Sequence, residues 1–177
     1  MSGMTRGPAL LFSILLASAA GPALGQGAVS ALKGHNSNAP VDVEADRIEV
    51  QDRADRAIFS GNVNVRQADL TMNSARLTVA YSGGTSGTQI QRLDASGGVT
   101  VRSPSETARG SVAIYDLDRR LITMLGNVTL TQGANTVNGG RLVIDLDSGR
   151  STIDGKGVGG ASGGRVTGRF TVRPSGN

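Results

Sequence analysis

Closely spaced carboxylates are the residues of this sequence that could do chemistry, because paired acids can serve as a general acid and a general base. Asp42, Glu44 and Asp46 stand at alternate positions, and Asp116 and Asp118 repeat that spacing. Two such groups flanking a sugar would suffice for glycoside cleavage, so this alternative stays open. Alternate positions share one face of an extended strand, however, and arginines stand nearby, as expected of a solvated sheet surface.

Other catalytic groups are scarce in this sequence. The chain has no cysteine and one histidine, His35, which lies in the Gly-, Ser- and Asn-rich residues 26–39. The rest of the chain therefore cannot form a catalytic triad of serine, histidine and aspartate, because it contains no histidine. It also has no phosphate-binding loop. We expect a flexible lead-in with an inert histidine, and a protein with no catalytic residue, no metal site and no cofactor.

The N-terminus indicates where the protein acts. Arg6 precedes an apolar run, ALLFSILLASAA at residues 9–20, and small residues and Pro22 follow. Such a run is too short for a membrane span, which takes about 20 residues. The sequence predicts a signal peptide over residues 1–25, cleaved after Ala19 or, as we prefer, after Gly25, and therefore an exported protein without disulfides.

From Val41 onward the chain alternates between aliphatic and polar residues, and the pattern reaches Leu146. Short runs of about five residues are separated by groups typical of turns, such as SGN, ASGG, LGN and NGG. Alternation between such groups predicts half-buried antiparallel strands, and no window of roughly twelve residues holds a helical period. The sequence therefore predicts an all-β fold.

One unit of sequence is used at least three times. Aligning Gly61, Gly97 and Gly126 superposes aliphatic residues two and four positions after each glycine, and residues 57–79 have a close echo in residues 122–144. Repetition of one supersecondary unit predicts an elongated stack of hairpins.

A stack of one-sided strands must hide its aliphatic face, so we expect the sheet to fold over into a flattened barrel or an open clasp with a dry inner surface. A lining of Val, Leu, Ile, Met and Ala suits alkyl chains, because each methylene moved out of water is worth about 0.8 kcal/mol. Composition alone favours the alternative, an ordinary packed core in an exported structural module that carries no lipid.

The two ends of such a stack are free strand edges, which recruit other chains. The early edge, PVDVEADRIEV at residues 40–50, is acidic, and the late edge, GRVTGRFTVR at residues 164–173, is basic. Unlike charges favour head-to-tail pairing of identical molecules into a filament. Nucleic acid is not an expected partner, because aromatic residues make up 3% of the chain and single-strand binding relies on stacking rings.

This sequence resembles the OstA-like (LptA) family of periplasmic lipopolysaccharide transport proteins. Three stretches carry the likeness: VDVEADRIEVQDRADRAIFSGNVNVRQADLTMNSARLTVAYSGG, ARGSVAIYDLDRRLITMLGNVTLTQGANTVNGGRLVIDLDSG and GGRVTGRFTVRP. The two GNV strands and the closing Arg-Val strand stand in the family's order. The likeness assigns residues 40–174 to one OstA-like domain with a tail at 175–177, and the Gly-rich GKGVGGASGGR before the last strand is a departure from the family.

The resemblance implies an elongated, twisted antiparallel β-clasp, also called a β-taco or open jelly roll, stacked end to end as a bridge across the periplasm. It further implies that an apolar groove shields the lipid A acyl chains of lipopolysaccharide. An inner-membrane-anchored transport partner would meet the N-terminal edge, and the outer-membrane translocon would meet the C-terminal edge.

The resemblance also implies two sets of site residues. The expected lipid-binding positions are Val41, Val43, Phe59, Val63, Val65, Leu77, Val79, Tyr115, Met124, Leu130, Leu142 and Ile144. The expected edge-interface positions are Val41, Asp42, Val43, Glu44, Arg165, Val166, Arg169, Phe170 and Val172.

Overall fold

The computed structural model describes residues 35–84, 87–156 and 164–171, and in these ranges the protein is all-β, as predicted. One short 3₁₀ turn, Asp52–Ala54, interrupts the strands, and no helix of the described chain could cross a membrane. The strands are β1 (Asp42–Glu44), β2 (Arg47–Gln51), β3 (Arg56–Gln67), β4 (Leu70–Gly84), β5 (Gly87–Arg102), β6 (Glu106–Asp116), β7 (Leu121–Gln132), β8 (Asn135–Asp145), β9 (Arg150–Asp154) and β10 (Thr167–Arg169).

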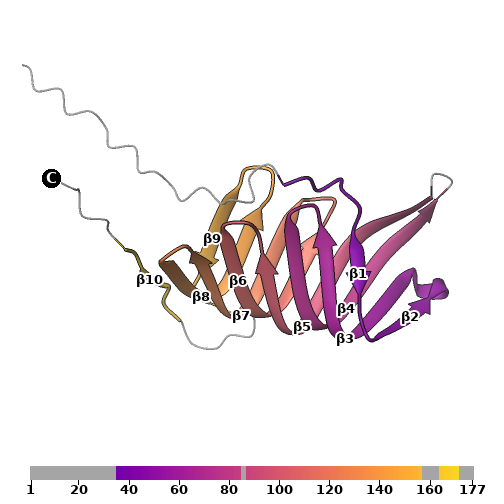
Figure 1. The fold of residues 1–177 in the computed structure, drawn as a ribbon, viewed down its shortest axis with the longest axis horizontal. Coiled ribbons are helices and arrows are strands. Elements are labelled where there is room, and N and C mark those ends of the chain that lie inside the picture. Colours follow the sequence, from indigo (N-terminus) through magenta and orange to yellow (C-terminus); the bar gives the residue numbers. More distant parts are fainter. Residues whose placement is uncertain (1–34, 85–86, 157–163, 172–177) are drawn as a thin grey trace, which may run out of the picture.

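All strands pair antiparallel in one sheet, in the order β1-β3-β4-β5-β6-β7-β8-β10. Two further strands pair beside this path. β1 lies on the second half of β3 and β2 on its first half, while β10 lies on the first half of β8 and β9 on its second half. Each long strand therefore contributes one half to each of two layers. We call them the β1 layer, which runs from β1 to β10, and the β2 layer, which runs from β2 to β9 (Figure 1).

Bulges near the middle of the long strands separate these two layers. In β3, β5 and β7 the backbone enters the left-handed region at Gly61–Asn62, Gly97–Gly98 and Gly126–Asn127, with φ between 46° and 84°. The register of every neighbouring pair slips at these points. Extra residues on one strand bend it sharply, so the three bulges mark a row of corners along which the sheet folds over.

The corners explain both the repeat and an error in predicting turns. The aligned glycines Gly61, Gly97 and Gly126 are the first residues of the three bulges. The sequence predicted loops at SGN, ASGG, LGN and NGG. That prediction is wrong, because strands of 11 to 16 residues run through all four groups. Glycine and asparagine tolerate positive φ in a bulge as well as in a turn, so the same residues serve both structures.

The core lies between the two layers. Inward side chains alternate with outward ones along each strand: on β6, Ala113 and Tyr115 are buried, and Val112, Ile114 and Asp116 beside them are only partly buried. Leu77, Met124 and Leu142 are among the side chains with no exposed surface. Burying one such side chain is worth about 1.5 to 3 kcal/mol, so the fold depends on the corners that bring the two inner faces together.

Gly97 and Gly98 give a matched test of the corner. Both have φ near +84°, but a Cβ at Gly97 would lie 2.6 Å from the Cβ of Ala75 on β4, whereas a Cβ at Gly98 would meet nothing within 4 Å. Each alanine substitution carries the left-handed strain of about 1–2 kcal/mol. Gly97→Ala also displaces β4 and is expected to lower the free energy of unfolding by about 1–3 kcal/mol more than Gly98→Ala, as measured by urea denaturation. Equal losses would contradict the assignment of Gly97 to a tight corner.

Candidate functional site

The interior between the layers gathers every residue that the sequence predicted to face inward. All twelve belong to one hydrophobic cluster. Eight of them are buried: Val63, Val65, Leu77, Val79, Tyr115, Met124, Leu142 and Ile144. The other four are partly buried and pack against the rest: Val41, Val43, Phe59 and Leu130. The alternation of the strands therefore does place these positions on a common inner wall, although contact with a lipid is a separate question.

The middle of this interior is filled by the chain's own side chains. Leu70, Met72, Ile122 and Leu142 have no exposed surface, so the two layers touch each other there. This part of the interior resembles the ordinary packed core that composition favoured, and not a groove left open along its length. Interiors packed in this way leave no room for a ligand unless the layers separate.

The N-terminal end of the interior is open. Ile48 and Val50 on β2 pair with Phe59 and Ala57 on β3, which places them on the inner side of the β2 layer. They are nevertheless 56% and 57% exposed. An apolar inner face left uncovered at a sheet edge favours contact with another apolar surface. The list of expected site residues omitted both, although their alternation with Arg47 and Glu49 carried the signal.

The C-terminal end of the interior holds a cavity of about 440 Å³. Its apolar walls are Leu130, Val137, Ile153 and Phe170, from β7, β8, β9 and the segment after β10. Its polar lining includes Glu106, which is mostly buried and accepts a hydrogen bond from Gln132 Nε2 at 3.2 Å. A mostly apolar cavity of this size with a few polar groups has the character of a small-ligand pocket.

Prediction from sequence found this cavity only in part. Leu130 was expected to bind lipid and Phe170 was expected at the edge, but Val137 and Ile153 were missed. Both residues face inward. Glycines interrupt the alternation after Val137 in β8, and Ile153 lies in the short strand β9 that follows a turn. Phe170 is 67% exposed, and the edge of its ring packs against Gly168.

The open side opposite the corners, where the hairpin turns lie, is the seam of the clasp. Residues 35–39, which we call the strap, run along this side before the chain enters β1 (Figure 1). Gln67 and Tyr115, both almost fully buried, come from opposite layers and meet beneath the strap, where the Tyr115 hydroxyl donates to Gln67 Oε1 at 2.8 Å. Burial raises the pKa of Tyr115, so the hydroxyl remains a donor at neutral pH.

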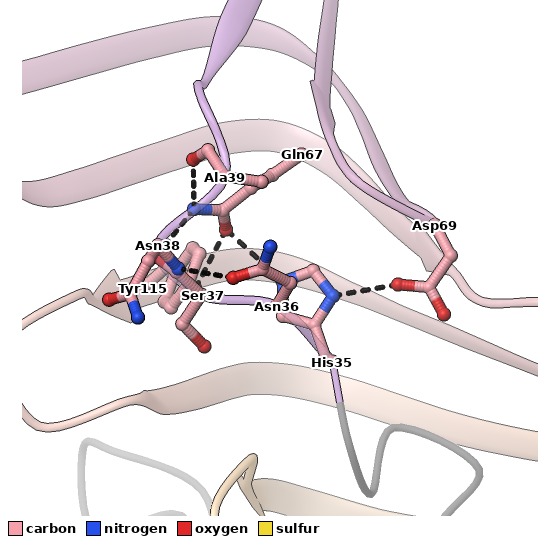
Figure 2. A network of polar contacts seen from close by, with 8 residues as sticks. All are labelled: His35, Asn36, Ser37, Asn38, Ala39, Gln67, Asp69 and Tyr115. Atoms are coloured by element: carbon pink, nitrogen blue, oxygen red, sulfur yellow. Dashed lines mark hydrogen bonds and ion pairs between the residues drawn. The ribbon is translucent and has the colours of Figure 1, made fainter.

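His35 joins this network between Gln67 and Asp69 (Figure 2). Its Nδ1 lies 2.8 Å from Asp69 Oδ1 and its Nε2 lies 3.2 Å from Gln67 Oε1. The side chain has no exposed surface. The interpretation of His35 as inert, in a flexible lead-in, therefore needs correction for residues 35–39. A single histidine in a polar stretch gave no signal of partners more than thirty positions away.

The two ends of the strand order carry the expected edge residues. Asp42 and Glu44 of β1 are exposed and Val41 and Val43 face the core, while Arg165, Val166, Arg169 and Phe170 are exposed at the β10 end. Val172 lies outside the described residues. Among the described strands, β9 pairs only with β8 and so forms a second edge at the C-terminal end, in the β2 layer, which was not predicted.

The acidic residues show how the carboxylates are used. Asp94, Asp116 and Asp154 lie within 4.0 Å of arginines on the sheet surface, and Asp46 accepts a hydrogen bond from Asn62 at a corner. Hydrogen bonds from Ser148 and from the Asp147 backbone lower the pKa of Asp145, the last residue of β8. Among the described residues, no three His, Asp or Glu side chains are grouped so that they could hold a metal ion.

An antiparallel sheet folded over an apolar interior, with open ends and an open seam, defines the β-clasp class of proteins. A family model described as LptA/(LptD N-terminal domain) LPS transport protein matches residues 42–150, from β1 to the start of β9. The chain belongs to this family.

Two known proteins are similar over most of the chain. An uncharacterized protein of Rhizobium meliloti (strain 1021) is 34% identical over 176 residues, which cover 90% of this chain and 91% of that protein. The crystal structure of LptH from Pseudomonas aeruginosa, the LptA homologous periplasmic component of a lipopolysaccharide transport device, matches with a TM-score of 0.67 at 16% identity. That match covers 78% of this chain and 99% of LptH, and it confirms the predicted fold.

Proposed function

We propose that this protein is a non-catalytic periplasmic carrier that shields the lipid A acyl chains of lipopolysaccharide during transport from the inner to the outer membrane. Membership of a lipopolysaccharide transport family supports the pathway. The observation that carries the proposal is the common apolar interior, which ends in the cavity lined by Leu130, Val137, Ile153 and Phe170. Acyl chains entering such a space gain about 0.8 kcal/mol per methylene.

Entry of an acyl chain would begin where apolar surface is already accessible. The C-terminal cavity and the exposed Ile48 and Val50 provide such surface at the two ends. Further entry requires the layers to part, and their continuous backbone connections lie at the corners, opposite the seam. The clasp would therefore open about its corners, with lipid replacing the contacts that the two inner walls now make with each other.

Transfer across the periplasm would use the ends of the clasp. The acidic β1 edge and the basic β10 edge favour head-to-tail pairing of two copies, which would align their interiors. In this proposal the N-terminal edge receives cargo from an inner-membrane-anchored partner, and the C-terminal edge delivers it to the outer-membrane translocon. The energy for directional movement comes from a partner.

A second candidate, an exported structural module with no lipid cargo, is favoured by the packed middle of the interior. The absence of exposed surface at Leu70, Met72 and Ile122 is what a solid core requires. This candidate predicts a rigid interior that no lipid enters, so the same labelling experiment distinguishes the two.

Photo-crosslinking tests the cargo. A benzophenone amino acid at Leu130 would line the cavity, whereas one at the adjacent Thr129, on the outer face of β7, would point away from it. With purified lipopolysaccharide, labelling from position 130 is expected to exceed labelling from position 129 by about tenfold, because only the probe at position 130 would lie beside an acyl chain bound in the apolar cavity. Equal labelling at both positions would favour the structural module.

The edge strand gives a test of head-to-tail assembly. Deleting residues 164–177 removes β10, whose three residues are all exposed, and leaves the buried core intact. We expect oligomers that form with rising concentration in the full chain to be lost, as measured by analytical ultracentrifugation.

A full-length control keeps the strand and reverses its charge. Arg165→Glu together with Arg169→Glu should weaken assembly, and adding salt should weaken it in the unaltered chain, because the attraction between the edges is screened. Oligomers that survive the deletion would place the interface elsewhere.

A further inference from the structure

The strap is a short folded segment with its own hydrogen bonds. The Ser37 N–H donates to the His35 carbonyl and the Ala39 N–H to the Asn36 carbonyl, each at 3.1 Å, and Asn36 Oδ1 accepts from the Asn38 N–H at 3.1 Å. Two turns in succession hold residues 35–39 in one shape. The strap is therefore placed by specific contacts and not by apolar burial alone.

Gln67 ties this strap to the clasp, and its amide has only one consistent orientation. Its Nε2 donates to the carbonyl oxygens of Ser37 at 2.9 Å and Ala39 at 3.0 Å. Carbonyl oxygens accept only, so the amide nitrogen must face them and the amide oxygen must face Tyr115 and His35. Gln67 Oε1 is thus an acceptor on both of its contacts.

This orientation determines the charge of His35. Its Nε2 faces the amide oxygen of Gln67, and its Nδ1 faces the Asp69 carboxylate, which is 46% exposed. Both partners accept only, so both ring nitrogens must carry a proton. The strap as it stands holds an imidazolium, whereas a neutral ring would turn one bare nitrogen toward an oxygen.

The hydrogen bond between Tyr115 and Gln67 joins the two layers across the seam, and His35 contacts the Gln67 side of that bond. Gln67 and Asp69 lie at the end of β3 and in the following turn of the β1 layer, and Tyr115 lies near the end of β6 in the β2 layer (Figure 2). The nearby charged groups are Asp69 and, beside Tyr115, Arg120, whose own partner is Asp147 at 2.8 Å. Asp69 is thus the only carboxylate among the described residues that pairs with His35.

We propose that residues 35–39 are a proton-dependent latch on the seam, closed when His35 is charged and released when it is neutral. Histidine changes charge between about pH 5 and pH 8. As pH rises through that range, the ion pair with Asp69 and one buried hydrogen bond are lost, and Gln67 is freed from the strap. This inference rests on the proposed carrier function for its consequence, which is that the latch controls sideways access of lipid to the interior.

Nuclear magnetic resonance of the full chain tests the latch without any lipid. At about pH 5 both His35 ring N–H protons should be seen, and backbone amides of Ser37, Asn38 and Ala39 should be protected from exchange. Between about pH 5 and pH 8 their protection, corrected for intrinsic exchange, should fall by about tenfold or more, because release is coupled to loss of one proton.

Two variants and a control make this test specific. His35→Gln cannot supply the charge, so its strap should be unprotected at every pH. Asp69→Asn removes the anion that holds the proton, so its opening midpoint should move to lower pH. Asp118→Asn, which removes an exposed acid in another turn, should behave like the unaltered chain. Strap protection independent of pH in the unaltered chain, or unchanged in His35→Gln, overturns the latch.

Uptake of a fluorescent fatty acid then separates the latch from the carrier function. If both are right, uptake by the unaltered chain is several-fold faster at about pH 8 than at about pH 5, and His35→Gln is fast at both. Uptake that is equally fast at both pH values and in His35→Gln contradicts the latch and leaves the carrier function standing. No uptake by any variant contradicts the carrier function, while the exchange measurement still decides the latch.

Discussion

The bend in the middle of each long strand is the constraint on which the rest of the structure depends. A strand with one aliphatic face can bury it only against another such face, and here each strand supplies both partners by turning at a corner. Gly61, Gly97 and Gly126 make this turn because glycine adopts positive φ readily, and because a Cβ there would strike Asp46, Ala75 and Ser111 respectively. The interior, the open seam and the free edges all follow from those corners.

Much of this arrangement was predictable from sequence, because alternation directly encodes which side chains share a face. All twelve residues expected to face inward lie in one cluster, since a period of two is the geometry of a strand. The corners were mistaken for loops, because Gly-Asn is equally suited to a turn and to a bulge, and the choice depends on neighbouring strands. The contacts of His35 were not predictable, since no local pattern specifies a partner in a distant turn.

The packed interior of this structure leaves no room for lipid in its middle, although the protein belongs to a lipopolysaccharide transport family. In the closed form Leu70, Met72 and Leu142 are in contact with other side chains of the core and exclude solvent, whereas the ends expose Ile48, Val50 and Phe170. Both features are reconciled if the clasp alternates between a closed form and one whose layers part around lipid. Contacts across the seam, between Gln67, Tyr115 and the strap, would stabilise the closed form, while the corners would keep the layers joined in both.

Separation of the layers by cargo is the central claim, and a spin-label distance measurement tests it most directly. Labels at Thr123 and Thr131 would lie on the outer faces of the β2 and β1 layers, on either side of the corner in β7. With lipopolysaccharide added, the distance distribution between the labels should move to longer values, and it should return when the lipid is removed. An unchanged distribution at saturating lipopolysaccharide would contradict the account and leave the clasp as a solid structural module.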